Sequence, residues 1–373
     1  MRRIIAQARK ELTQTFRDRL TLVLALVLPL LLMALLGTAV SLTVSDLPIV
    51  VQDFDASPLS QKYVDAFRSS LTFRVVTLPP NIQPETALDR SLARAALVIP
   101  EHFERDLRRG GNAEVQFLID ATDANTANIM RGTASAVSQQ WAMRELQAGA
   151  GASASRPAIR AETRIWFNPG RESRKYIGPG VLAVGLSLFP PLLAALAMSR
   201  EGEQKTILQV YVSSISAGEF LAGKILAYFT IALAEWVLLI IMSFTLFGLR
   251  LAGDPTPLLV GTVCYLLCTV SFGTMVGVAI PNQAAAIQAV ALVGFLMSFL
   301  MSGFIFPIEN IPPALRWISN FVPARYYIEV ARDAFVRGGG WPGVWHAPLL
   351  LLLLGGFFFF NAWRKLRRMQ VEA

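Results

Sequence analysis

The polar stretch from residue 199 to residue 224 contains the spacing of a phosphate-binding loop. Gly218 and Gly223 are separated by four residues, and Lys224 follows directly. In nucleotide-binding proteins such a loop follows a strand, and a Ser or Thr after the Lys binds magnesium. Here Ile225 replaces that hydroxyl residue, and the motif stands at the start of a long apolar run. We therefore expect no nucleotide site at this motif.

Cysteine and histidine are too few to support metal or disulfide chemistry. Cys264 and Cys268 are spaced to lie on one face of an apolar helix, but no other Cys or His is near them in the sequence. We interpret them as packing residues. Residues 43–175 contain one histidine, His102, no cysteine and no Gly-x-Ser-x-Gly motif, which gives hydrolase chemistry little support. The sequence predicts no catalytic residue, no cofactor site and no metal site.

Glu235 is the one acidic residue well inside an apolar run. A carboxylate inside a membrane costs several kcal/mol unless it is paired, protonated or placed in a wet cavity. Two interpretations of this residue stay open. It either lines a wet cavity or gate, or it is bonded to a neighbouring helix for structural reasons.

The overall composition is that of a membrane protein. Of the 373 residues, 54% are hydrophobic and 16% are charged, with a mean hydropathy of +0.48. Soluble domains carry about 25% charged residues, and several nearly uncharged runs here reach the ~20 residues that cross a bilayer as a helix. Much of the net charge of +8 flanks these runs and anchors membrane faces, so we expect no nucleic-acid partner.

We predict six membrane-spanning helices. They cover residues 20–42, 176–198, 220–249, 257–280, 284–306 and 345–363. A signal peptide is the alternative for the first run, which is too long for one. Short cytoplasmic segments are rich in Lys and Arg, and a cytoplasmic N-terminus places 13 of them inside and 5 outside. We therefore expect both termini, including the tail 364–373, in the cytoplasm.

Residues 43–175 differ from the rest and are predicted to form an extracytoplasmic α/β domain. Strand-like runs cover residues 48–53, 73–78, 95–99, 114–119 and 164–167. Helical runs cover 60–70, 84–93, 101–109 and 125–147. Strands separated by helices favour a mixed or partly parallel sheet, whose strand order the pattern leaves open.

Residues 1–19 have the pattern of a basic amphipathic helix. One stripe consists of Ile5, Ala8, Leu12 and Phe16. The opposite side carries Arg3, Lys10, Gln14 and Arg17. Such a helix directly before a span predicts a segment lying in the plane of the membrane interface. A plain positively charged flank is the alternative.

Residues 307–343 are too polar to span the membrane and too apolar to be a free loop. We predict two short helices, separated at Pro323, that enter the membrane partly from the outside; an ordinary interfacial loop is the alternative. The apolar stripe of the second helix consists of Tyr327, Val330, Ala331 and Ala334. Two ion pairs are expected along it, Glu329 with Arg332 and Asp333 with Arg337.

Several of these stretches closely resemble ABC-2 type transporter permeases. Residues 302–340 resemble the region before the last span of that family, and residues 200–226 resemble its cytoplasmic coupling segment. Residues 17–32 and 166–180 resemble its first span and the entry to its second. The resemblance implies a polytopic α-helical, type V exporter-like permease. It also matches the subgroup with a large extracytoplasmic domain between the first two spans, typical of bacterial multidrug exporters.

The resemblance also implies partners and a site. It predicts a second permease, either a copy or a paralogue, and two cytoplasmic ATPase chains that bind ATP and Mg, in the bacterial inner membrane. Membrane lipids and a periplasmic adaptor protein are further expected partners. Residues 199–219 form the expected coupling loop, with Glu201, Glu203, Lys205, Thr206 and Gln209 as its coupling residues. Lys205 stands where the family often has Gly, which is expected to change the turn of the loop.

The expected function is export of a drug-like or amphipathic substrate. The candidates for pathway or gate residues are Glu235, Gln288, Pro307, Glu329 and Arg332. Export of a lipid or polysaccharide is an open alternative. A membrane-anchored receptor that binds a ligand with its outer α/β domain is an alternative of another class.

Overall fold

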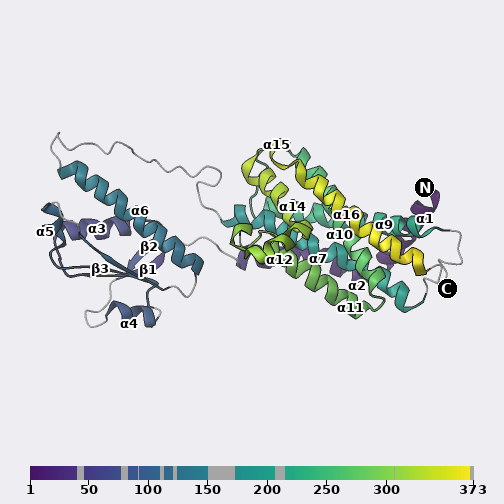
Figure 1. Cartoon of the computed structure of the whole chain (residues 1–373), viewed down its shortest axis with the longest axis horizontal. Coiled ribbons are helices and arrows are strands. Elements are labelled where there is room, and N and C mark those ends of the chain that lie inside the picture. The colour runs from purple at the N-terminus through teal and green to yellow at the C-terminus, as the bar shows by residue number, and fades with distance from the viewer. Residues whose placement is uncertain are drawn as a thin grey trace. The chain divides into compact units, whose positions relative to one another are not determined.

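Figure 1 presents a computed structural model of the chain. The structure describes residues 1–39, 46–76, 83–90, 92–109, 113–120, 124–149, 173–205, 215–305 and 307–369. The chain divides into two compact units, one of Leu42–Thr163 and one of Met1–Ser41 with Arg164–Ala373. The predicted strand 164–167 and the coupling candidates Thr206 and Gln209 lie outside the described residues.

The unit that contains both ends of the chain is helical, and its longest helices are apolar (Figure 1). Its helices include α1 (Arg2–Arg17), α2 (Arg19–Ala39), α7 (Ser173–Glu203), α9 (Ala217–Thr245), α10 (Thr256–Ala279), α11 (Gln283–Ala289), the π-helical η1 (Val290–Leu296), α12 (Met297–Met301) and α16 (His346–Met369). Five helices within the described ranges are long and apolar enough to cross a membrane. These candidates are Lys175–Glu203, Ala217–Thr245, Thr256–Ala279, Gln283–Met301 and His346–Arg367.

Five of the six predicted spans are thus confirmed as long apolar helices. The first, over residues 20–42, stays a prediction, because the apolar part of α2 found among the described residues is the shorter Ala25–Leu36. The predicted coupling loop, residues 199–219, is too long at both ends. The helix α7 continues to Glu203, and α9 already begins at Ala217. The acidic residues assigned to the loop are therefore the last turn of a helix.

Small residues allow α7 and α10 to pack closely. A Cβ atom added to Gly277 of α10 would lie 2.6 Å from the carbonyl oxygen of Ala195 on α7, and one added to Gly273 would collide with the carbonyl oxygen of Pro191. Such pairs of small residues, four positions apart, bring membrane helices into backbone contact. On another face of α10, Cys268 is buried and packs against Gly355 of α16, as a packing residue would.

The polar stretch after α12 folds into short helices. They are η2 (Ile308–Asn310), α13 (Pro313–Arg316), η3 (Trp317–Phe321), α14 (Pro323–Arg332), the π-helical η4 (Asp333–Arg337) and α15 (Trp341–Val344). A helix does begin at Pro323, and the predicted apolar stripe from Tyr327 to Ala334 is buried. Gly261 of α10 leaves room for Val330 of α14, so α14 packs into the bundle.

The ion pair predicted between Glu329 and Arg332 is wrong. Glu329 Oε2 lies 3.4 Å from Nε2 of His346. Arg332 lies over the ring of Tyr176, 4.3 Å from its centroid, and donates a hydrogen bond to the carbonyl oxygen of Phe304. The two side chains are drawn apart because α14 packs on α7 and α16 at once, and each neighbour offers one of them a partner.

The pair predicted between Asp333 and Arg337 is also wrong. Asp333 is buried and accepts hydrogen bonds from the backbone N–H groups of Gly339 and Gly340. The segment from Asp333 to Arg337 is a π-helix, whose wider turn removes the i,i+4 neighbour geometry of an α-helix. Asp333 therefore stabilises the glycine turn instead of the helix surface.

The unit Leu42–Thr163 is built on a four-stranded sheet. The strands β1 (Leu47–Asp53), β2 (Phe73–Val76), β3 (Ala95–Ile99) and β4 (Gln116–Ile119) are ordered β2-β1-β3-β4. The strands β2, β1 and β3 are parallel to one another, and β4 is antiparallel to β3. Four predicted strands and the predicted mixed sheet are therefore confirmed, with ends that differ by a few residues.

Helices cover both faces of this sheet (Figure 1). The helices α3 (Pro58–Arg68), α5 (Phe103–Arg108) and α6 (Ala124–Gly149) pack on one face, and α4 (Pro84–Asp89) packs on the other. The larger core is aromatic and includes Tyr63, Phe67, Phe103 and Trp141. Burial of this apolar area, at about 25 cal/mol per Å², is the main term that stabilises the unit.

Candidate functional site

The helix α1 lies in direct contact with the first turns of α9. A Cβ atom added to Gly223 would lie 2.7 Å from Cβ of Gln7 and 3.0 Å from the carbonyl oxygen of Ile4. Only glycine leaves room for a helix at that distance. The second glycine of the phosphate-loop spacing therefore serves helix packing.

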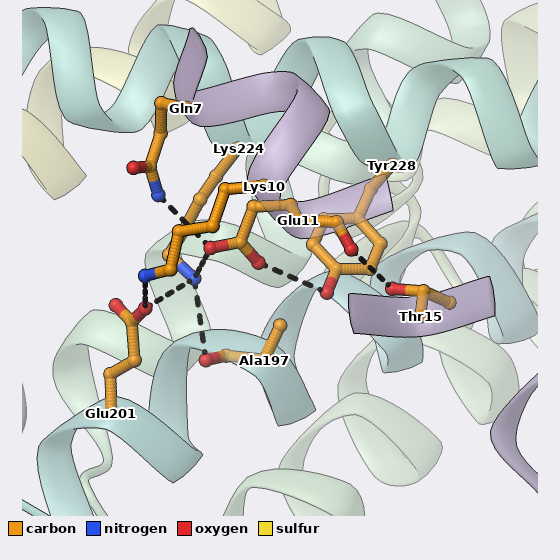
Figure 2. Close-up of polar contacts among 8 residues, drawn as sticks. All are labelled: Gln7, Lys10, Glu11, Thr15, Ala197, Glu201, Lys224 and Tyr228. Atoms are coloured by element: carbon orange, nitrogen blue, oxygen red, sulfur yellow. Dashed lines mark hydrogen bonds and ion pairs between the residues drawn. The ribbon is translucent and has the colours of Figure 1, made fainter. Parts of the chain in front are cut away.

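The lysine of the same motif is buried where α1, α7 and α9 meet (Figure 2). Lys224 is 1% exposed, and its Nζ lies 2.9 Å from Oε1 of Glu11 and 3.2 Å from Oε1 of Glu201. The carbonyl oxygen of Ala197 lies 3.5 Å from the same nitrogen. A buried ammonium group is tolerated only with such partners.

Glu11, on α1, receives the largest share of these contacts. It is 3% exposed and accepts hydrogen bonds from Lys224, from Nε2 of Gln7 at 3.0 Å and from the hydroxyl of Tyr228 at 3.4 Å. Thr15 bonds to the backbone carbonyl of the same residue. The carboxylate is therefore desolvated but well satisfied.

The four charges of this ion cluster balance. Glu201 accepts a second cation, Lys10, whose Nζ lies 3.6 Å from Oε1. We name Lys10, Glu11, Glu201 and Lys224 the clamp, because they join α1, the end of α7 and the start of α9. Removing one partner of a buried pair costs about 3–5 kcal/mol, because the other charge is left buried without compensation.

Further polar contacts fix the two helix ends on either side of residues 206–214. Glu203, on the last turn of α7, accepts hydrogen bonds from the backbone N–H of Gln283 at 3.3 Å and from its Nε2 at 2.8 Å. Ser216 and Glu219 form a capping box at the start of α9. The segment between them is thus attached to helix ends that are tied to α1 and α11.

Lys205 has a left-handed backbone, with a φ of 57°. It stands just beyond α7, and its N–H donates to the carbonyl oxygen of Gly202. Glycine is the usual residue at this position after a helix, and an L-residue in the left-handed conformation costs about 1–2 kcal/mol. The resemblance suggested a changed turn; the chain instead keeps the turn that suits glycine.

The predicted apolar stripe of α1 is only partly buried, and the interfacial position of this helix stays a prediction. Ala8 is buried, whereas Ile5 and Phe16 are 60% and 61% exposed. The buried face instead includes Glu11 and Thr15, because the glycine and lysine of α9 draw this side of the helix inward. The predicted interfacial residues Arg3, Lys10 and Arg17 are exposed; Arg3 lies 3.8 Å from Glu219 and Lys10 belongs to the clamp. The helix thus has a polar buried face, an exposed apolar edge and a basic face.

The structure does not bring the pathway and gate candidates into one site. Glu235 is 1% exposed within α9. Gln288, on α11, and Pro307 are exposed, whereas Glu329 and Arg332 are half-buried and bonded to different neighbours. No group of three His, Cys, Asp or Glu side chains suited to a metal ion occurs within the described ranges.

Sequence reasoning missed Glu11, Gln7 and Tyr228. A usable signal existed: Glu11 is the only acidic residue in the basic segment 1–17, and Lys224 is the only cation in the apolar run 220–249. Two opposite charges, each in a segment that otherwise lacks its sign, are candidates for an ion pair with one another. Nothing local in the sequence joins them, because they are separated by 213 residues.

Comparison with known proteins gives a family match that spans the long apolar helices. The family model of ABC-2 family transporter proteins matches residues 19–364. The chain is similar to "Probable multidrug ABC transporter permease YbhS" of Escherichia coli K12, with 28% identity over 90% of this chain and 89% of the relative. It is 24% identical to "Probable multidrug ABC transporter permease YbhR" of the same organism, over 92% and 93% of the two chains.

A relative with lower identity comes from Bacillus subtilis. "Linearmycin resistance permease protein LnrN" of Bacillus subtilis is 22% identical over 91% of this chain and 92% of its own length. The family match covers both the long apolar helices and the α/β unit. The chain therefore belongs to the ABC-2 family of transporter proteins and is a permease of an ABC-type transporter.

Proposed function

We propose that this permease, with a second copy or a paralogue, forms an export pathway for a drug-like or amphipathic substrate. Separate cytoplasmic ATPase subunits bind ATP and Mg and power the transport. The multidrug and resistance names of the relatives support this substrate class. In this proposal the chain lies in the bacterial inner membrane, with both termini in the cytoplasm and the α/β unit outside.

The clamp is the observation that carries the coupling part of the proposal. Residues 206–214 connect the end of α7 with the start of α9. Lys224 of α9 pairs with Glu11 of α1, and Glu201 of α7 pairs with Lys224 and with Lys10 of α1. A push by an ATPase on the segment between them is received by three helices as one body. The movement then enters two candidate spans, α7 and α9, together.

This arrangement changes which residues test the coupling. Charge reversal at Glu201 breaks the clamp, and charge reversal at Glu203 breaks the contact with Gln283. Loss of transport in those variants reports on folding as much as on coupling. Thr206 and Gln209, which lie outside the described residues, remain coupling candidates.

The deciding experiment reconstitutes the permease with the ATPase that co-purifies with it. Proteoliposomes are loaded with a fluorescent amphipathic dye, and ATP-dependent dye movement and ATPase activity are measured together. We expect ATP-dependent movement in the wild type and substrate-stimulated ATPase activity that Thr206→Trp and Gln209→Trp reduce. Absence of a co-purifying ATPase, or dye movement that ignores ATP, overturns the proposal.

A further inference from the structure

Glu235 lies in the middle of α9, on the side that faces the other helices. It is 1% exposed, and neither carboxyl oxygen has a hydrogen-bond partner among the described residues. Glu11 is equally buried but has three donors. An unsatisfied buried polar group is rare enough in proteins to need a reason.

Polar side chains of α9, α10 and α14 in the same bundle bond to one another. Trp236 donates a hydrogen bond of 2.9 Å to the hydroxyl of Tyr327, which also bonds to Thr262 at 2.9 Å. Tyr265 stacks on Tyr327 at 4.4 Å between ring centroids. The hydroxyl of Tyr265 donates a hydrogen bond of 2.7 Å to the carbonyl oxygen of Ala183.

No charged side chain among the described residues compensates Glu235. The helix α10 has no charged residue, and its titratable side chains Cys264, Tyr265 and Cys268 are neutral near pH 7. On α14, Tyr327 is also neutral, Glu329 is turned to His346, and Arg332 lies over Tyr176. The charges of α7 lie in its first and last turns.

A carboxylate without a hydrogen-bond partner or counter-charge is strongly disfavoured inside a membrane. The side chain is therefore neutral in this conformation, with its proton on one carboxyl oxygen. Leucine would fill the same place without any unmade hydrogen bond. The carboxyl group thus lowers the stability of the closed bundle, and a benefit must arise in another conformation.

We propose that Glu235 is a proton-binding site linked to the opening of the bundle. The carboxyl group keeps its proton while the helices enclose it. When they separate and water enters, the O–H bond breaks, the proton passes to water as hydronium and a hydrated carboxylate remains. The inference rests on the proposed function only in that opening belongs to a transport cycle.

The direction of the linkage follows from which state binds the proton. The closed state binds it more tightly than the open state, so acid favours closure and alkali favours opening. One proton shifts the equilibrium by up to about tenfold for each pH unit inside the linked range.

A hydrophobic carbodiimide tests the site directly, because it reacts with protonated carboxyl groups in apolar surroundings. The full-length permease in lipid nanodiscs is treated with dicyclohexylcarbodiimide over a pH series, and the modified residues are identified by mass spectrometry. We expect Glu235 to be modified at acid pH and progressively less as the pH rises. Glu11, buried but paired with Lys224, is the control and stays unmodified. A Glu235 that is never modified, or equally modified at every pH, overturns the proposal.

Transport supplies the second readout. Glu235→Gln keeps the size of the side chain but cannot lose a proton, so we expect ATP-driven dye movement with a flattened pH profile. A profile identical to that of the wild type overturns the proposal. If the wild type shows no ATP-driven movement, the proposed function fails, while carbodiimide modification still decides the proton site.

Discussion

Glu11 and Glu235 are two carboxyl groups with almost the same burial and opposite surroundings. Glu11 is 3% exposed and Glu235 is 1% exposed. The first meets a lysine, a tyrosine and an amide, whereas the second has no hydrogen bond within the described part of the chain. Burial alone therefore says little about the role of a charged residue. The partners decide whether it holds helices together or exchanges a proton.

Removing Lys224, the buried lysine of the clamp, tests the first half of this comparison and has the largest expected effect. Lys224→Met keeps the length of the side chain but leaves Glu11 and Glu201 facing each other without a cation between them. We expect the free energy of unfolding to fall by about 3–5 kcal/mol, measured by thermal unfolding of the purified permease. Lys205→Met, on an exposed side chain, is the matched control. Equal melting temperatures for the two variants would contradict the clamp.

The second half of the comparison predicts a change of opposite sign. Glu235→Leu removes a polar group that has no partner, so we expect stability to rise by about 1–3 kcal/mol. The same substitution at Glu11 removes the acceptor of Lys224 and lowers stability. Thermal unfolding of both leucine variants measures the contrast. A destabilising Glu235→Leu would mean that this carboxyl group has a partner in the folded state.

The clamp also depends on the close approach of α1 to α9. In Gly223→Ala the new methyl group meets Gln7 and the backbone of Ile4, which forces the helices apart. We expect a loss at the lower end of about 1–3 kcal/mol, because alanine adds only one carbon. The control is Gly356→Ala on α16, where a Cβ atom meets nothing within 4 Å. If both variants unfold at the same temperature, the packing contact contributes nothing.

The smallest expected effect concerns the end of α7 next to the clamp. Lys205→Gly relieves a left-handed backbone and raises stability by about 1 kcal/mol, less the entropy that glycine gains in the unfolded chain. Lys205→Ala, with the same loss of charge but a Cβ atom, separates the backbone effect from the electrostatic one. Identical melting temperatures for the glycine and alanine variants would show that the turn carries no strain.

Local patterns in the sequence predicted the elements well. Four strands of the α/β unit and the buried stripe of α14 follow from the alternation or helical spacing of apolar residues. The predicted ion pair between Asp333 and Arg337 was wrong because a π-helical turn changes the spacing on which the prediction rests. The polar buried face of α1 was not predicted, since the partners of that face are a glycine and a lysine that lie far along the chain.

The candidate site was predicted only in part. Glu201 and Glu203 were expected to matter, but as surface for an ATPase, whereas the structure places them in contacts with Lys224 and Gln283. Lys224 was singled out because it completes the spacing of a phosphate-binding loop, but in the structure it pairs with Glu11 and Glu201. Glu235 was recognised from its position in an apolar run, while the absence of a bonding neighbour needed the packed helices.

The separation of Glu11 and Lys224 along the chain also has a consequence for biosynthesis. Glu11 is translated before Lys224, which follows 213 residues later. At ~5–20 residues per second that interval lasts roughly 10–40 s. During it, Glu11 lacks its buried partner Lys224, so α1 can wait only where water or lipid headgroups solvate this carboxylate. Completion of the clamp is therefore a late event, and a ribosome that stalls before α9 leaves behind a chain with its N-terminal helix undocked.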